Sequence, residues 1–382
     1  MAKQIVRFGI IGGGLMGREL AGAMARWCYL LDLDFEARLV AVCSAHSSSL
    51  EWFQRNFADL QLATTDYQEL LDNPNVDAVY CAVPNNLHQR MYVDTIQAGK
   101  HLLGEKPFGI DLSANQAILE AIARQPGVLV RCSSQYIYQP GAYRIAQWLR
   151  AGRFGQIIEV ETGLWHSSDL NPEKPINWKR QASVNGEYGC MGDLGMHILH
   201  IPLRAGWRPR NVRALLSKII TERPDHSGRR VPCDTWDNAI LACEASAGDH
   251  TFPMLVSTKR IAPGHANTWF IRILSTSLSA EFSSKNPKQI AWLPYAPGDE
   301  QAWQVMDVPF QSAYPTIAGA IFEFGFHDAV LQMLAAFCDE LLHGPDMRQP
   351  IHCVTPEETA VSHRLFTAAL ESQRSGQTIV LE

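Results

Sequence analysis

The sequence lacks any long apolar run. No stretch reaches the ~18–20 consecutive apolar residues that a membrane-spanning helix needs, and the longest candidates are broken by Gly, Pro or charge. We therefore expect no membrane partner. In the first residues, MAKQIVRFGIIGGG, an apolar stretch runs directly into a glycine loop instead of the small-residue cleavage site of a secretory signal. The protein is accordingly expected to be cytoplasmic.

An excess of charge of one sign is also lacking. The 33 Lys and Arg residues and the 39 Asp and Glu residues give a formal net charge of -6, which does not supply the basic surface that neutralises a phosphate backbone. Nucleic acid is thus not expected as a partner. The nine cysteines are scattered with no Cys-x-x-Cys pair, so neither a disulfide framework nor a thiolate zinc site is indicated. We expect mostly buried thiols.

The apolar content is sufficient for a large buried core. Of the 382 residues, 46% are hydrophobic and 19% are charged, and at roughly 150 residues per domain the length predicts two to three domains. Between residues 5 and 132, short apolar runs alternate with segments of helical period, as in βαβ units. We predict an N-terminal Rossmann domain over residues 1–132, with a doubly wound parallel sheet. The expected strands are Val6–Ile11, Arg38–Cys43, Ala78–Val83, His101–Gly104 and Val128–Cys132, and the expected helices are Leu15–Leu30, Ser48–Phe57, Tyr67–Leu71, Leu87–Ala98 and Ser113–Ala123.

A second domain is predicted over residues 133–382, because the chain changes character after Pro140. A helix over Ala142–Ala151 and a strand over Ile157–Leu164 precede a long irregular polar segment that reaches Gly192. The remaining pattern predicts an α/β domain built on a largely antiparallel open sheet, with one face covered by helices. Its further strands are expected at Arg213–Ile220, Ala239–Glu244, Pro253–Lys259, Trp269–Leu274, Ser279–Phe282 and Gln304–Val308, and its last helices at Ala329–Leu342 and Pro356–Ser375.

The first strand leads into a glycine loop. Gly12, Gly14 and Gly17 form G-x-G-x-x-G between a strand and a helix, with Leu15 and Met16 inside the motif. The first glycine makes the tight turn, the second lets the backbone approach a pyrophosphate, and the third allows close helix packing. This context predicts a dinucleotide site rather than a plain glycine-rich turn.

The end of the second strand bears on the choice between NAD and NADP. An enzyme selective for NAD places Asp or Glu there to bind the ribose hydroxyls, but this chain has Cys43, Ser44 and then Ala-His-Ser-Ser. The missing carboxylate and the hydroxyls favour NADP slightly over NAD. Since no Arg lies in this stretch, a merely polar surface turn stays open as the alternative.

Several further segments make the sequence similar to a known family. They are Pro84-Asn85-Asn86-Leu87-His88, Ala98–His101, Gly104-Glu105-Lys106-Pro107, Tyr136 with Pro140, Trp178–Arg180, the segment GDLGMH over Gly192–His197, and Pro356–Ser375. Together with the glycine loop, they resemble the Gfo/Idh/MocA family, the glucose-fructose oxidoreductase and inositol dehydrogenase superfamily. The tripeptide Glu-Lys-Pro is the most specific of these motifs, and the resemblance spans nearly the whole chain.

The resemblance implies NAD(P)-dependent oxidation or reduction of a secondary alcohol in a sugar, cyclitol or related polyol. It also implies a homodimer or homotetramer formed through the C-terminal sheet. In this family the lysine of Glu-Lys-Pro lies beside the nicotinamide, often at a cis peptide bond, and later Asp and His residues complete the site. These catalytic roles fall on Lys106, Asp193 and His197. The cofactor contacts that we expect are Gly12, Gly14, Leu15, Met16, Gly17, Ser44, Pro84, Asn85, His88, Glu105 and Lys106.

The chemistry of the residues agrees with those roles. Asp193 and His197 are spaced i,i+4, so on a helix they share one face. An imidazole can take the hydroxyl proton near neutral pH, and the Lys106 ammonium would stabilise a developing alkoxide. The loop between Trp165 and Arg180 is aromatic and charged, and it suits a substrate lid or a domain-interface loop equally. The expected substrate contacts are Lys106, Tyr136, His166, Arg180, Asp193 and His197.

Two positions depart from the family pattern. His200 stands where cyclitol-acting members have an acidic residue, and Ile137 replaces an Arg. Asp193, His197 and His200 can also be interpreted as metal ligands, but nicotinamide hydride chemistry needs no metal, so we expect none. Two other functions stay open: an NAD-dependent glycosidase of the same superfamily, and a non-catalytic regulator that binds the cofactor.

Overall fold

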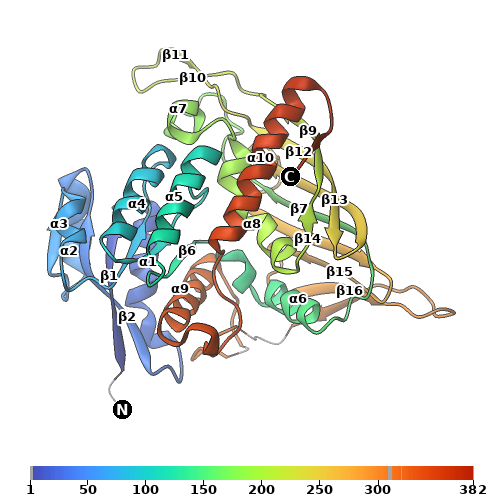
Figure 1. Cartoon of the computed structure of the whole chain (residues 1–382), viewed down its shortest axis with the longest axis horizontal. Helices are drawn as coiled ribbons and strands as arrows, with labels where there is room; N and C mark the ends of the chain where they lie inside the picture. Colours follow the sequence, from blue (N-terminus) through green and yellow to red (C-terminus); the bar gives the residue numbers. More distant parts are fainter. Residues whose placement is uncertain (1–2, 309–311, 320, 382) are drawn as a thin grey trace. The chain divides into compact units, whose positions relative to one another are not determined.

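The computed structural model describes residues 3–308, 312–319 and 321–381, and it divides the chain into two units (Figure 1). Unit 1 comprises the described parts of Met1–Gly109, Ser113–Tyr138 and Gln311–Pro356, and unit 2 those of Ile110–Leu112, Gln139–Phe310 and Glu357–Glu382. The two units are therefore interleaved in the sequence, whereas the expected division had a single boundary between residues 132 and 133. Residues 312–319 and 321–356 belong to the N-terminal unit, which no local sequence pattern indicated.

Unit 1 is built on a parallel sheet of six strands in the order β3-β2-β1-β4-β5-β6. This is the strand order of a doubly wound dinucleotide-binding fold, so the predicted Rossmann architecture is confirmed. The short strand β3 was not predicted, because its three residues carry no periodic pattern of their own. The strands are β1 (Gln4–Ile11), β2 (Phe35–Cys43), β3 (Leu62–Thr64), β4 (Ala78–Cys81), β5 (His101–Gly104) and β6 (Val130–Cys132).

The helices of unit 1 lie close to their predicted positions. Helix α1 ends at Ala25 rather than Leu30, because the Trp27 side chain is buried and its indole N–H donates to the Phe35 carbonyl at 3.0 Å. Helix α9 (Phe326–His343) also belongs to this unit, where it packs on α1 and β2, with the Phe337 ring 5.9 Å from that of Phe8. The other helices are α1 (Leu15–Ala25), α2 (Leu50–Asn56), α3 (Tyr67–Leu71), α4 (His88–Gln97) and α5 (Leu112–Arg124).

Unit 2 contains a sheet of ten strands, with β17-β16-β15-β14-β7-β13-β12-β9-β18 along its main path and β8 paired with β12. Only the β7–β13 pair among its described neighbours is parallel, so the predicted largely antiparallel sheet is confirmed. The strands are β7 (Ile157–Trp165), β8 (Arg208–Pro209), β9 (Asn211–Ser217), β12 (Asn238–Ala247), β13 (His250–Lys259), β14 (Thr268–Ser275), β15 (Leu278–Ser283), β16 (Gln289–Pro294), β17 (Gln304–Asp307) and β18 (Ile379–Val380). A separate hairpin pairs β10 (Glu222–Pro224) with β11 (Arg230–Pro232).

Helices cover one face of this sheet, and α8 is almost entirely buried there. In Figure 1 the C-terminal helix α10 runs alongside α8. Their close approach needs a glycine, since a Cβ at Gly195 would lie 2.4 Å from the Phe366 ring. The helices are α6 (Pro140–Arg150), α7 (Ala182–Asn185), α8 (Cys190–Arg204) and α10 (Pro356–Ser375).

Two expectations about the chain as a whole concern cysteines and membrane spans. All cysteines except the exposed Cys28 are buried thiols, as their scattered spacing predicted. Among the described helices, none combines the length and the apolarity that a bilayer crossing requires.

Candidate functional site

The glycine loop of unit 1 connects β1 to α1, and two of its glycines are required by the fold. Gly12 has φ +113°, and a Cβ there would lie 2.2 Å from the Ala82 carbonyl oxygen. A Cβ at Gly17 would lie 2.0 Å from the carbonyl oxygen of Gly12. Any side chain at either position would displace the backbone. The fold alone therefore requires glycine at these two positions, whether or not a ligand binds.

Gly14 is different, because nothing in the protein requires it. Apart from its chain neighbours, no heavy atom of the described residues lies within 4 Å of a Cβ built at this position, and its φ of -76° is open to any residue. Gly14 is the N-cap of α1, yet glycine supplies no capping side chain, and Ser, Asp or Asn would stabilise the helix better. The absence of a Cβ there leaves the backbone open to close approach, which is what a pyrophosphate at a helix N-terminus requires.

The first turn of α1 suits an anion. The helix begins at Leu15, followed by Met16, and its first turn carries no acidic residue. The first N–H groups of a helix have no hydrogen-bond partners within the helix. Leu15 is 74% exposed, so its side chain leaves this end of the helix open. The residues predicted around the pyrophosphate therefore lie together at one helix N-terminus.

Ser44 follows β2 and lies beside the same loop. A Cβ at Gly13 would lie 3.0 Å from the Ser44 Cβ and Oγ atoms, and the Ser44 side chain is largely buried. Arg18 lies in the first turn of α1, the helix that follows the loop. Its guanidinium carbon is 5.5 Å from the centre of the Trp52 ring on α2. Arg18 was missed from the sequence, where its only signal is that it directly follows the third glycine.

Two carboxylates also lie near the end of β2. Burial raises the pKa of the Cys43 thiol to about 11, with smaller contributions from the charges of Asp66 and Glu69. The side chain of Asp66 caps α3 by accepting from the Gln68 N–H at 2.9 Å. Glu69 accepts from the Thr64 hydroxyl at 2.6 Å. Both carboxylates thus have local partners within unit 1.

The Glu-Lys-Pro tripeptide follows β5. The Lys106–Pro107 peptide bond is cis, as the family resemblance implies. Glu105 is buried, and its Oε1 accepts from the hydroxyls of Tyr80 and Ser133, each at 2.6 Å. Burial raises the pKa of Tyr80 well above its ordinary value, so this phenol is a donor to Glu105. The Glu105 side chain therefore holds the tripeptide against the sheet, and its contact with a cofactor stays a prediction.

The segment after β4 carries the other predicted cofactor contacts of unit 1. Pro84 precedes a short 3-10 turn over Asn85–Leu87, in which Asn85 is buried. The His88 ring is fully buried, stacks on Tyr92 with centroids 4.8 Å apart, and bonds the Val83 carbonyl at 3.0 Å. His88 is thus part of the support of this segment. Tyr136, a predicted substrate contact, is also buried in unit 1.

Asp193 and His197 lie one turn apart on α8 of unit 2, a helix that the sequence analysis did not predict, although their i,i+4 spacing would place them on one face of a helix. Their side chains are 5% and 7% exposed. Asp193 lies in the first turn of the helix, where the partial positive charge of the N-terminus stabilises a carboxylate. One helix therefore presents an acceptor and an imidazole on a common face.

A buried network of charges surrounds Asp193. Lys179 Nζ lies 3.1 Å from its Oδ1, and the Arg260 guanidinium pairs with its Oδ2. Arg260 also lies 3.3 Å from an Asp169 oxygen. Burial by itself raises the pKa of Asp169. The charges of Arg260 and Arg180, together with the hydrogen bond and charge of Lys174, outweigh burial, so this pKa lies below its ordinary value. Arg260 was missed from the sequence, where a single Arg after a strand carries no motif.

Arg180, a predicted substrate contact, lies inside the same network. Its side chain is 0% exposed, pairs with Asp237, and lies 3.6 Å from Asp169. The structure thus gives Arg180 two acidic partners within unit 2, and its contact with a substrate hydroxyl stays a prediction. The backbone N–H of His166 donates to the Lys259 carbonyl at 2.6 Å, which ties the start of the predicted lid to β13.

His200 occupies the position at which the family pattern has an acid. It is buried, with Nδ1 3.3 Å from Glu358 Oε2 at the start of α10. An acidic side chain from another helix thus lies next to His200. Within the part of the chain that the structure describes, no three or more His, Cys, Asp and Glu side chains are grouped closely enough to hold a metal ion.

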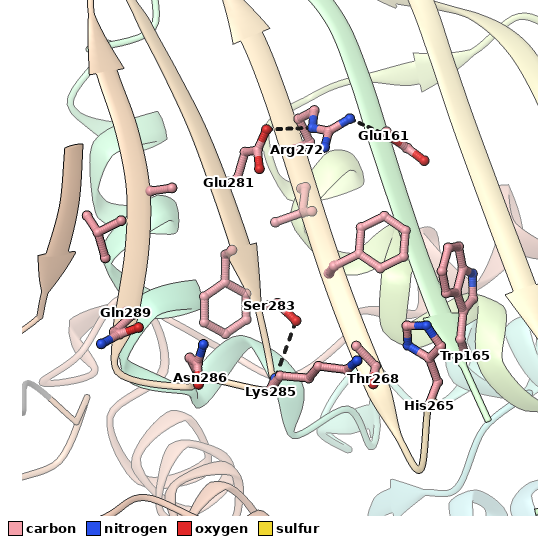
Figure 2. A pocket seen from close by; sticks show the side chains of 15 residues that line it. Glu161, Trp165, His265, Thr268, Arg272, Glu281, Ser283, Lys285, Asn286 and Gln289 are labelled. Atoms are coloured by element: carbon pink, nitrogen blue, oxygen red, sulfur yellow. Dashed lines mark hydrogen bonds and ion pairs between the residues drawn. The ribbon is translucent and has the colours of Figure 1, made fainter. Parts of the chain in front are cut away.

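A hollow of about 520 Å³ lies on the other face of the large sheet (Figure 2). Arg272 of β14 is one of the lining residues, and it bonds Glu281 of β15 at 2.7 Å and Glu161 of β7 at 3.2 Å. At its edge the Trp165 ring packs on Phe270 with centroids 4.9 Å apart. None of the predicted catalytic residues lines this hollow, so it is a separate feature of the open sheet face.

Comparison with known proteins places these features in context. Residues 6–132 match the model of the GFO_IDH_MocA family, described as an oxidoreductase family with an NAD-binding Rossmann fold. A levoglucosan dehydrogenase of Pseudarthrobacter phenanthrenivorans is 26% identical over 227 residues, which are 59% of this chain and 57% of that protein. The chain therefore aligns with little more than half the length of this relative.

Solved structures resemble the whole chain. An oxidoreductase domain protein from Kribbella flavida has a TM-score of 0.89 at 20% identity, with 100% of each chain covered. Levoglucosan dehydrogenase in complex with NADH and L-sorbose has a TM-score of 0.86 at 20% identity, with 99% of each chain covered. At this identity the likeness shows that both units share the fold of these proteins.

Proposed function

Since residues 6–132 match the GFO_IDH_MocA oxidoreductase family, we propose that the whole chain belongs to this family and is an NAD(P)-dependent dehydrogenase. It transfers a hydride between the nicotinamide and a secondary alcohol or ketone of a sugar, cyclitol or related polyol. Gly14 is the observation that carries the dinucleotide part, because its missing side chain serves neither the packing nor the conformation of the protein. The substrate part is supported by the named activity of the levoglucosan dehydrogenase relative.

The bound dinucleotide supplies the group that accepts or returns the hydride. His197 exchanges the proton of the substrate hydroxyl, for which an imidazole is suited near neutral pH. Lys106 orients the hydroxyl oxygen and supports its developing negative charge. Asp193, held by Lys179 and Arg260, accepts a hydrogen bond from the substrate. Tyr136, His166 and Arg180 stay in the proposal as further substrate contacts.

For the cofactor we propose a slight preference for NADP over NAD. No carboxylate directly follows β2, and Ser44 lies against the glycine loop. The stretch after β2 has no Lys or Arg, but Arg18 provides a cation on α1, next to the glycine loop. Its guanidinium is suited to binding a 2'-phosphate. No metal takes part in the proposed reaction.

A panel of substrates with both cofactors tests the proposed function. Purified protein is mixed with levoglucosan, myo-inositol, glucose and xylose, and with NAD or NADP, and the nicotinamide absorbance is followed. Net reduction of cofactor with at least one substrate supports the proposal. Cleavage of a glycoside without net cofactor turnover supports the glycosidase instead. Dinucleotide binding without any turnover supports the regulator.

We also propose a homodimer or homotetramer formed through the large sheet of unit 2. Its open face carries apolar side chains that are 37–71% exposed, and Figure 2 shows the hollow on that face. Leu215 and Ile240 lie opposite each other on β9 and β12. The exposed apolar residues are Leu215, Ile240, Leu255 and Val305.

Light scattering after size exclusion tests this assembly. Ile240→Asp places a charge on the open face and is expected to lower the mass of the particle toward that of one chain. Glu244→Asp on the same strand is the control and should leave the mass unchanged. A parent protein of one-chain mass would contradict the proposal.

A further inference from the structure

Arg260 is a buried cation with two acidic partners. It directly follows β13, its backbone N–H donates to the Asp237 carbonyl at 2.9 Å, and the residue is 5% exposed. Its guanidinium pairs with Asp193 and lies 3.3 Å from Asp169. A buried ion pair alone is weak grounds for stability, because desolvation offsets most of the attraction. The placement of this cation therefore calls for a role beyond holding the fold.

The two oxygens of Asp193 have different cationic partners. Lys179 lies 3.1 Å from Oδ1 and is about one-third exposed, whereas Arg260 pairs with Oδ2 from the buried side. This arrangement fixes the rotation of the carboxylate about its Cβ–Cγ bond. It also stabilises the ionised form, since two cations face it. Asp193 is thereby an acceptor of fixed direction and a poor carrier of protons.

Asp169 allows a guanidinium to be buried at this place. Burial lowers the pKa of Arg260, and the negative charge of Asp169 opposes that effect. The loop that carries Asp169 is itself anchored, because Arg223 of β10 donates to the carbonyls of Asn171 at 2.7 Å and Lys174 at 3.2 Å. Hydrogen bonds from Arg223 of the β10–β11 hairpin thus fix the loop that carries Asp169. The Asp169 carboxylate in turn pairs with the Arg260 guanidinium.

We propose that Arg260 is a positioning residue for the reaction. It orients the Asp193 carboxylate toward the substrate hydroxyl and keeps it ionised, so that proton exchange falls to His197. This assignment rests on the proposed function, because it concerns the direction of an acceptor toward a sugar or polyol. Arg260 acts only through Asp193 and touches no substrate itself.

A double-mutant cycle on kcat/KM tests the assignment, with the substrate that the panel identifies. Arg260→Gln is expected to lower kcat/KM about a hundredfold, since a displaced catalytic group costs that order of rate. Asp193→Asn should itself cost about a hundredfold, at the lower end of the range expected for a proton-transfer group. In the Asp193→Asn background, Arg260→Gln should then cost less than about threefold, because the group through which Arg260 acts is already altered. Arg260→Lys should restore part of the activity, as it keeps the charge but not the two-sided geometry.

The controls separate a positioning role from general damage. Arg213→Met removes an arginine on strand β9 that bonds the Ser372 carbonyl at 3.1 Å, and it should leave kcat/KM within about twofold. Dinucleotide affinity should stay within about twofold in every variant, because the glycine loop lies in unit 1. If Arg260→Gln does not fold, the cycle is run with Arg260→Lys.

The positioning role of Arg260 and the dehydrogenase activity would be refuted by different results. Additive effects of the Arg260 and Asp193 substitutions, or parent-like turnover in folded Arg260→Gln, would overturn the positioning role while leaving the dehydrogenase intact. A parent protein that turns over no substrate overturns the proposed function, and the role of Arg260 falls with it.

Discussion

Gly14 allows the dinucleotide site to be tested apart from the fold. In Gly14→Ala the new methyl group meets none of the described atoms beyond its chain neighbours within 4 Å, and the φ of -76° is normal for alanine. Replacing glycine by alanine at such a position gains about 0.4–1 kcal/mol by restricting the unfolded chain. Alanine is a poorer N-cap than glycine, which opposes that gain by a similar amount. The free energy of unfolding should therefore change by less than about 1 kcal/mol.

Cofactor binding should respond far more strongly. The methyl group would occupy the space that the pyrophosphate needs at the start of α1, and we expect the dissociation constant to rise at least about tenfold, equivalent to about 1.4 kcal/mol. Titration of NADH and NADPH by fluorescence measures the affinity, and thermal unfolding without cofactor measures the stability. Loss of affinity at unchanged stability is the expected result.

Two other glycines of α1 provide matched controls. A Cβ built at Gly22 also has no described atom within 4 Å apart from its chain neighbours and the backbone of its own helix. Gly22→Ala lies inside the helix, so it should stabilise the protein by about 0.5–1 kcal/mol with normal cofactor affinity. Gly17→Ala would force a methyl group to 2.0 Å from a backbone oxygen and should destabilise the fold. Parent-like affinity in Gly14→Ala would refute the assignment of this loop to the pyrophosphate.

Three further predictions concern specificity, chemistry and pH. Ser44→Asp should raise the preference for NAD over NADP about tenfold or more, since a carboxylate binds the ribose hydroxyls and repels a 2'-phosphate; strong exclusion of NADP by the parent would contradict our interpretation of this turn. Lys106→Ala and His197→Ala should each lower kcat about a hundredfold to ten-thousandfold with dinucleotide affinity largely kept, and Asp193→Asn should be less damaging; near-normal turnover of folded His197→Ala would leave Lys106 as the proton carrier. The pKa of Asp169 lies below its ordinary value of ~3.9, so its contribution to stability is present above that value and is lost as pH falls through the folded-state pKa; thermal unfolding from pH 3 to 8 should show Asp169→Asn less stable than the parent at pH 7, with a gap that narrows toward pH 3.

Much of the fold follows from local patterns in the sequence. The parallel strands of unit 1 are short apolar runs, and α3 and α10 have the predicted bounds Tyr67–Leu71 and Pro356–Ser375. The i,i+4 spacing of Asp193 and His197 indicated a shared face if the segment were helical, and α8 provides that helix. These features are readable because each depends on residues close together in the sequence.

The remaining features depend on contacts between distant residues. Helix α9 was predicted as an amphipathic segment, but its return to unit 1 depends on packing against residues some 300 positions away, such as Phe8. Arg180 was predicted to contact a substrate hydroxyl, which stays a prediction, but no local pattern indicated that Asp237 and Asp169 lie beside it in the buried network. Arg260 carries no motif, and only the fold brings it to Asp193.

The transfer of deuterium from a substrate carbon to the nicotinamide directly tests the proposed hydride transfer. Purified protein is incubated in ordinary water with oxidised NAD or NADP and with levoglucosan or another active sugar that is deuterated at all its carbon atoms. Hydride transfer predicts one deuterium per reduced nicotinamide, carried over from the substrate carbon and detected by mass spectrometry and NMR. Reduced cofactor without deuterium, or no reduced cofactor with any sugar or polyol, would contradict the account.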